Sequence, residues 1–216
     1  TQRAIRSNSQ DRPYDFVLMA LINVEDPGLK VQPYHRILKG MDSNNIATLK
    51  NKIEDMFDVT LVGQKTSKML EDANSVISNL MTRDISEVAI GVIGLYDDGP
   101  VVLTKPKEKF LQELATKAPS NSLLHCEPWI LQEGVLIPAL GIRGDEESNI
   151  LAMDFNHDAD QVAKAISFGE YQIGFLVRAV PIDVLEGVVQ DGALLPPKST
   201  YFAPKLLTGV VFNLLD

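Results

Sequence analysis

The stretch ILAMDFNHDADQVAKAISFGEYQIGFLVRAVPIDVLEGVVQ (residues 150–190) decides the fold class. Its apolar runs at 150–155 and 171–180 predict strands, and the segment after each run has the apolar spacing of an amphipathic helix. Strands that alternate with helices are typical of crossover connections, which favour a sheet that is at least partly parallel. We therefore expect a mixed α/β fold, in which helices and a mixed sheet are combined as in α+β proteins. A last strand is expected at 206–214.

The N-terminal half predicts helices and a β-hairpin. Two strand-like runs at 87–96 and 101–104 flank the turn sequence Asp97-Asp98-Gly99, so together they predict the hairpin. Apolar residues at helical spacing predict amphipathic helices at 46–56 and 69–80. The remaining expected elements are a buried strand at 16–24, a short strand at 58–63, a charged helix at 107–117 and an apolar helix at 129–140.

A single mixed α/β domain is expected over residues 14–216. The chain has 216 residues, 45% of them hydrophobic, which is enough to bury a sizeable core. Residues 1–13 are polar, and we interpret them as a leader at the end of an upstream segment. The soft sequence Ala-Pro-Ser-Asn-Ser at 118–122 is the candidate for an internal boundary.

The composition argues against several classes of protein. A net charge of −9 without a basic stripe disfavours nucleic acid as a partner. No apolar run has the length of a membrane span, and the single cysteine, Cys126, fits a cytoplasmic location. The histidines His35, His125 and His157 lie far apart and match no metal-binding motif, so no metal is expected.

A proline-rich stretch from Pro196 to Lys205 is the first candidate site. Proline fixes its φ and lacks an N–H donor, so the stretch predicts a stiff loop rather than a helix or central strand. Lys198, with the hydroxyls of Ser199 and Thr200, suits the oxygens of a phosphate or another small anion, and Lys205 adds a second cation. The alternative is a connector with solvated lysines and packed aromatic rings.

A turn followed by a histidine and an arginine is the second candidate site. Asp26-Pro27-Gly28 is a strong turn sequence, and Glu25 and Asp26 place two carboxylates there. His35 can carry a proton near neutral pH, and Arg36 can hold a phosphate with two hydrogen bonds. We interpret Glu25, Asp26 and His35 as candidate catalytic groups and Arg36 as an anion ligand. The alternative is a turn with a surface ion pair.

Four motifs in register resemble a microbial family catalogued as domain of unknown function ten-fifteen. The motifs are Asn-Val-Glu-Asp-Pro-Gly-Leu (23–29), Tyr-His-Arg-Ile-Leu (34–38), Ile-Gly-Leu-Tyr (93–96) and Pro-Pro-Lys-Ser-Thr-Tyr-Phe-Ala-Pro-Lys-Leu-Leu-Thr-Gly (196–209). The resemblance implies an upstream segment with an Asp-Gly-His-His-Arg motif, similar to ParB-like and sulfiredoxin-like nucleotide-binding folds that include free-serine kinases. Gln132 departs from the pattern, since many relatives have histidine there.

The resemblance also implies a function. Relatives are often encoded beside enzymes of serine biosynthesis, so we expect the C-terminal part of a phosphoryl-transfer enzyme on a small metabolite, of the free-serine kinase or phosphoserine phosphatase type. A nucleotide would then serve the full-length protein, and the partners would be an anionic metabolite, its own N-terminal segment and a second copy of the chain. The alternative is a non-catalytic small-anion sensor or an assembly domain.

Overall fold

The computed structural model confirms a mixed α/β fold and divides the chain into two compact units. One unit comprises residues 31–201 and contains the main sheet, whereas the other combines the described parts of 1–30 and 202–216. Residues 118–122 lie within the first unit. The structure describes residues 15, 18–63, 68–142, 151–207 and 209–212.

The main sheet has six strands in the order β3-β5-β4-β7-β2-β6, and every neighbouring pair is antiparallel. The expectation of a partly parallel sheet is therefore wrong. The hairpin of β4 and β5 is confirmed, with Ala89 opposite Thr104. The strands are β2 (His35–Lys39), β3 (Asp58–Leu61), β4 (Ala89–Ile93), β5 (Val101–Thr104), β6 (Ala152–Asn156) and β7 (Ile173–Leu176).

The position of β2 explains this difference. Helix α7 (Ala159–Ser167) connects β6 to β7, and both strands run antiparallel to β2, so they share one direction as a crossover requires. However, β2 lies between them and pairs with both. A strand from the N-terminal half thus separates the two parallel strands, and no pattern within 150–190 could predict its insertion.

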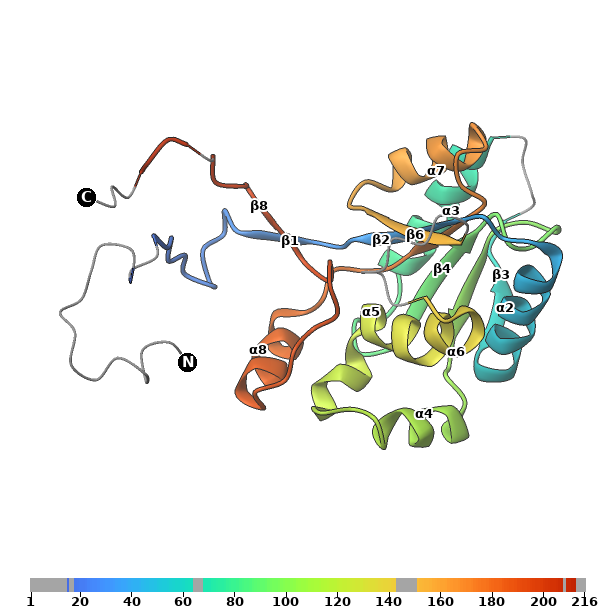
Figure 1. Ribbon diagram of the computed structural model, residues 1–216, viewed down its shortest axis with the longest axis horizontal. Helices are drawn as coiled ribbons and strands as arrows, with labels where there is room; N and C mark the ends of the chain where they lie inside the picture. The colour runs from blue at the N-terminus through green and yellow to red at the C-terminus, as the bar shows by residue number, and fades with distance from the viewer. Residues whose placement is uncertain (1–14, 16–17, 64–67, 143–150, 208, 213–216) are drawn as a thin grey trace. The chain divides into compact units, whose positions relative to one another are not determined.

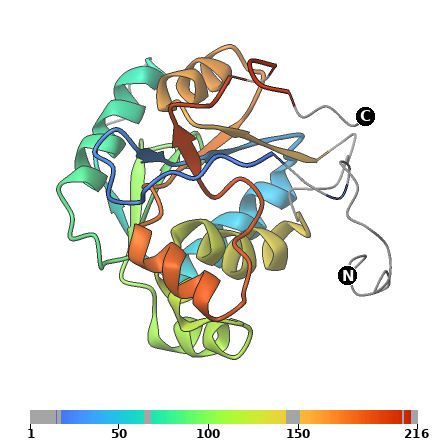
Figure 2. The ribbon, with the colours of Figure 1, turned by 90° about the vertical axis from the view of Figure 1, so that its left-hand side faces the viewer.

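Helices cover both faces of the sheet in the unit 31–201 (Figures 1 and 2). Helices α3 (Met69–Met81) and α7 pack on one face, where Val76 and Val162 belong to one apolar cluster. Helix α2 (Ser43–Met56) and the helical segment 127–140 cover the other face. The other described helices are α4 (Glu108–Ala115), the 3-10 helix η2 (Asn121–His125) and α8 (Ile182–Gln190).

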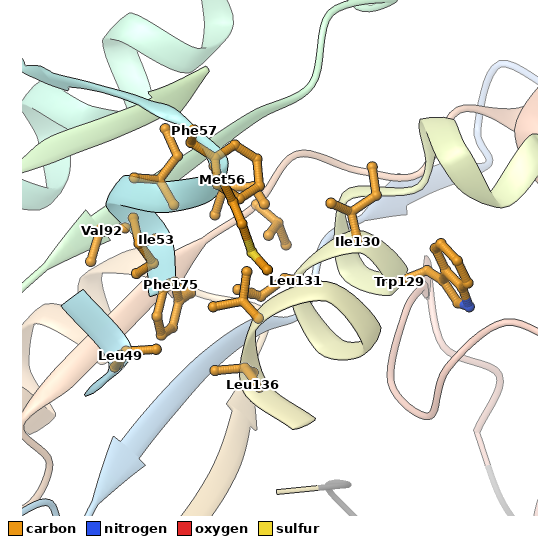
Figure 3. Close-up of a cluster of buried hydrophobic side chains, with 14 of the residues drawn as sticks. Leu49, Ile53, Met56, Phe57, Val92, Trp129, Ile130, Leu131, Leu136 and Phe175 are labelled. Carbon is orange, nitrogen blue, oxygen red and sulfur yellow. The ribbon is translucent and has the colours of Figure 1, made fainter. Parts of the chain in front are cut away.

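The larger apolar cluster is centred on α2 and the helical segment 127–140 (Figure 3). Leu49 and Ile53 of α2 and Phe175 of β7 are fully buried in it, and Trp129 is also buried, as expected for a core residue. The helix expected at 129–140 is confirmed as three consecutive segments: α5 (Glu127–Trp129), the π-helix η3 (Ile130–Leu136) and α6 (Ile137–Leu140).

The apolar run at 16–24 does not form the expected buried strand. Residues 18–24 have no strand structure, and Leu21 is 93% exposed. An apolar run becomes a buried strand only where a neighbouring strand accepts its backbone hydrogen bonds, and no described strand pairs with it. The expected strand at 16–24 is therefore wrong over its described residues.

The strand expected at 206–214 is also absent over its described residues. The described residues of 206–212 form no strand, whereas β8 (Tyr201–Ala203) lies within the stretch expected to be a loop. It pairs with β1 (Lys30–Gln32) in a separate two-stranded sheet. The prolines at 196, 197 and 204 flank these three residues and leave their N–H groups available. A short strand can therefore form between the prolines.

Candidate functional site

Tyr34 joins the two candidate motifs of the unit 31–201. The Arg36 guanidinium donates a hydrogen bond from NH1 to the Tyr34 carbonyl oxygen. The Lys198 ammonium lies 5.6 Å from the centre of the Tyr34 ring. We call Tyr34, Arg36, His157, Lys198 and Tyr201 the Tyr34 junction. Two cations from segments far apart in the sequence thus flank one tyrosine.

Three aromatic rings form the middle of the Tyr34 junction. The Tyr34 ring lies edge-on to Tyr201 at 5.7 Å and to His157 at 6.3 Å between centres. His157 and Tyr201 lie 4.3 Å apart. His157 follows the last residue of β6, and Asp158 caps α7, so His157 lies in the turn between this strand and this helix. The contacts of His157 and Tyr34 were missed from sequence, because their partners come from other elements.

Arg36 is buried completely in a central strand. Its Nε and NH2 atoms have no hydrogen-bond partner among the described residues, and its guanidinium lies 5.4 Å from the Phe155 ring centre. Burial lowers the pKa of Arg36 to about 10, which leaves it charged at neutral pH. No carboxylate of the described residues pairs with Arg36, and a buried cation without such a partner lowers the stability of the fold.

His35 precedes Arg36 on β2, and their side chains point to opposite faces of the strand. Burial, followed by the charge of Arg36, lowers the pKa of His35 to about 4, so its imidazole is uncharged at neutral pH. Its Nδ1 accepts a hydrogen bond from the Val177 amide at 3.3 Å. The proton of the neutral ring therefore sits on Nε2, and neither nitrogen has a free lone pair. A catalytic role for His35 stays a prediction.

Three side chains of the loop 196–200 were expected to bind phosphate, and only that of Lys198 is exposed. Lys198 is exposed and adopts a left-handed backbone, with φ of +55°. The Ser199 side chain is buried, and its hydroxyl donates to the Pro196 carbonyl oxygen at 2.8 Å, so it holds the turn itself. Thr200 is half-buried. Phosphate binding by these residues stays a prediction, and Ser199 could contribute only an acceptor while its present bond lasts.

Glu25, Asp26 and Lys205 lie in the other unit, and all three are exposed. The expected turn is confirmed: the Leu29 amide donates to the Asp26 carbonyl at 2.9 Å, and Asp26 Oδ1 accepts from the Gly28 amide at 2.8 Å. The Asp26 carboxylate therefore has a structural role within its own turn. The roles assigned to these three residues from sequence stay predictions.

Gln132 is the residue at which the chain departs from the family pattern. It lies in η3 and is buried, and its Oε1 has no hydrogen-bond partner among the described residues. An unpaired buried acceptor is unusual in a folded protein. A histidine at this position would offer a different donor and acceptor set, so the departure changes a buried polar position and not a surface one.

Over the described residues, no group of three or more histidine, cysteine, aspartate and glutamate side chains could hold a metal ion. None of the helices described has both the length and the apolar character that a bilayer crossing requires.

The unit 31–201 is thus a six-stranded antiparallel sheet with helices on both faces, and it contains the Tyr34 junction. The chain belongs to the family described as "Protein of unknown function (DUF1015)", whose model matches residues 1–124. The match includes His35 and Arg36, whereas Lys198 lies outside it. A search of curated proteins finds no match.

Several solved structures are distantly similar. A conserved hypothetical protein from Pyrococcus furiosus has 17% identity and a TM-score of 0.44, and the alignment covers 85% of this chain and 60% of that one. A free serine kinase mutant in complex with AMP has 15% identity and a TM-score of 0.44, covering 85% and 58%. A free serine kinase in complex with AMP has 14% identity and a TM-score of 0.42, covering 85% and 58%. The chain thus spans about three fifths of the length of these proteins.

Proposed function

We propose that the Tyr34 junction binds the phosphate group of a small metabolite, and that the chain is part of a phosphoryl-transfer enzyme. One observation carries the proposal: the fully buried Arg36 has two nitrogen atoms without a hydrogen-bond partner among the described residues. A phosphate oxygen would accept from these atoms and compensate the buried charge. Arginine suits this task because its planar donors match two phosphate oxygens at once.

Lys198 supports the same ligand from the solvent side. Lys198 is exposed, and its ammonium lies over the Tyr34 ring. The backbone carbonyl of the same tyrosine accepts a hydrogen bond from Arg36. A phosphate bound beside Tyr34 would therefore meet a buried cation and an exposed one.

The substrate class is the finer part of the proposal, and it rests on the resemblance of the four motifs. A serine hydroxyl would attack the transferred phosphorus, its P–O bond would form as the bond to the leaving group breaks, and a base would take the hydroxyl proton. His35 has no free lone pair for this proton. Glu25 and Asp26 belong to the other unit, so their catalytic role stays a prediction from the sequence alone and is not part of this step.

Calorimetric titration with inorganic phosphate and with O-phosphoserine tests the binding step. We expect Arg36→Met to abolish binding and Lys198→Ala to weaken it about tenfold, since a hydrogen bond to a charged group contributes ~1.5 kcal/mol or more. Lys105→Ala is the matched control, because Lys105 is also an exposed lysine with a positive φ, of +46°. Equal affinities of the Lys198→Ala and Lys105→Ala proteins would contradict the proposal.

Phosphorus NMR tests the chemical step. The protein would be incubated with serine and a nucleoside diphosphate or triphosphate, or with phosphoserine alone, and phosphate transfer followed. Turnover that is lost in Arg36→Met would support an enzyme. Tight binding of phosphoserine without turnover would favour the alternative, a non-catalytic anion sensor. One observation favours the sensor: His35 is neutral and its Nδ1 already accepts a hydrogen bond, so it offers no proton acceptor beside Arg36.

A further inference from the structure

A cavity of about 310 Å³ lies in the unit 31–201, and no residue of the Tyr34 junction lines it. The loop after α3, the helix η2 and the first turn of α8 meet around it. Its volume is at the lower end of the range of small-molecule sites, which runs from ~300 to ~1,000 Å³. The lining includes Ile85, Ser86, Ser122, His125, Pro181 and Asp183.

The buried residue Arg178 holds one wall of this cavity in place. Its NH1 donates to the Asp84 carbonyl at 2.9 Å and its NH2 donates to the Glu87 carbonyl, so bonds fix the loop on both sides of Ile85 and Ser86. Arg178 is itself held by the Glu127 carboxylate, at 2.8 Å from Nε and 2.6 Å from NH2. The loop that carries Ile85 and Ser86 is therefore held in position before a ligand binds, which lowers the entropic cost of binding against it.

The opposite wall forms where α8 packs closely on η2. A methyl group added at Gly187 would lie 2.1 Å from the Ser122 hydroxyl oxygen, which shows how near the two segments approach. Two sides of the cavity are thus held in place: the loop by its bonds to Arg178, and α8 by its packing against η2.

The polar groups of the cavity offer acceptors and no permanent cation. Asp183, Ser122 and His125 make no side-chain hydrogen bond or ion pair with the described part of the chain. The Ser86 hydroxyl donates its proton to Asp84 Oδ1 at 2.8 Å, so it presents lone pairs to a ligand. No lysine or arginine lines the cavity, and the nearby Arg178 is committed to Glu127.

We propose that this cavity binds a small primary amine with an apolar carbon body. The three N–H groups of an ammonium would donate to the Asp183 carboxylate and to the hydroxyl oxygens of Ser86 and Ser122. Ile85, Pro181 and Val184 supply the apolar contact for the rest of the ligand. A carboxylate without a cation in the same cavity favours a positive ligand over a neutral or negative one of equal size.

Asp183 also lies in the first turn of α8, where a negative charge favours the helix whether or not a ligand binds. The test must therefore separate ligand binding from a helix effect. Asp160 is a matched control, since it is an exposed acidic residue in the first turn of α7 and does not line the cavity.

Amide NMR titration of the chain with isobutylamine tests the proposal, with isobutanol and isobutyrate as neutral and negative probes of similar size. We expect saturable shifts at 85–86, 122–125 and 182–184 with the amine alone. Asp183→Asn should weaken this binding about tenfold and Ser122→Ala about threefold, because the bond to Asp183 joins two opposite charges whereas Ser122 offers a neutral acceptor. Asp160→Asn should bind as the wild type does.

Two results would overturn the proposal. Isobutanol or isobutyrate binding at the same residues with the affinity of the amine would show that the cavity does not select a cation. Equal amine affinity of the wild type and of the Asp183→Asn protein would remove the carboxylate from the site. The Ser122→Ala protein decides the matter if Asp183→Asn does not fold, since unchanged affinity there would also contradict the proposed contacts.

Discussion

Arg178 and Glu127 form a buried ion pair in which NH2 lies 2.6 Å from Oε1 and the two side chains are only 8% and 6% exposed. The carboxylate also accepts from the backbone amides of Arg178, at 2.8 Å, and Ala89, at 3.1 Å. Through these bonds the end of β7, the start of β4 and the helix α5 are tied together. The pair has a complete set of partners, in contrast to Arg36, and we assign it a structural role.

Glu127→Gln should destabilise the protein by ~3 kcal/mol or more, because it leaves the Arg178 charge buried without its partner. Urea unfolding followed by circular dichroism measures the change. The control is Glu71→Gln, which removes one partner of the exposed Lys68–Glu71 pair and should alter the midpoint little. Equal midpoint shifts in the two variants would show that Glu127 is not a structural anchor.

Acidification should destabilise the protein through His35. Its pKa is lowered to about 4 in the folded state, against about 6.5 in the unfolded chain, so between these values the unfolded chain binds the proton. Stability therefore rises as the pH increases from 4 to 6.5 and is lost as the pH falls through this window, by up to ~3 kcal/mol. Urea unfolding at several pH values should give a shallower dependence for His35→Gln than for the wild type. Parallel curves would contradict the assignment.

Lys198→Gly should raise the free energy of unfolding by up to ~1 kcal/mol, because glycine adopts the left-handed backbone at +55° without a Cβ penalty. Lys105→Gly, at +46°, should do the same. The two variants should differ in phosphate binding, which only Lys198→Gly should weaken. Thermal unfolding with and without phosphate measures both effects. A similar loss of phosphate stabilisation in both variants would argue against the Tyr34 junction.

Gly94→Ala should destabilise the protein by ~3 kcal/mol or more. A Cβ there would lie 2.2 Å from the Gln172 carbonyl oxygen, and the φ of +81° already disfavours a side chain. Gly141→Ala is the matched control, since its φ is +71° and a Cβ would meet no described atom within 4 Å. It should cost only ~1 kcal/mol, the penalty of the left-handed backbone. Equal unfolding midpoints for the two variants would mean that β4 can move away from Gln172.

The spacing of apolar residues along the chain predicted those helices and strands whose buried face follows from that spacing alone. Helices α2, α3, α4, α7 and α8, and the hairpin of β4 and β5, lie close to where their apolar spacing and turn residues place them. The candidate site was predicted only in part. Arg36 and Lys198 could be chosen from the sequence because both are cationic residues in distinctive motifs. Their common neighbour Tyr34 could not, because that relationship depends on contacts between distant segments.

The class of fold, most of the described helices and the two motifs that carry the cations could be predicted from the order of residues, because they follow from side-chain spacing and backbone preference over a few residues. The antiparallel order of the sheet, the exposure of residues 18–24 and the burial of Arg36 and His35 depend instead on contacts between distant segments. The physical reason is that strand pairing and desolvation depend on which distant segment supplies the neighbour. The insertion of β2 between β6 and β7 decides both the sheet order and the environment of Arg36.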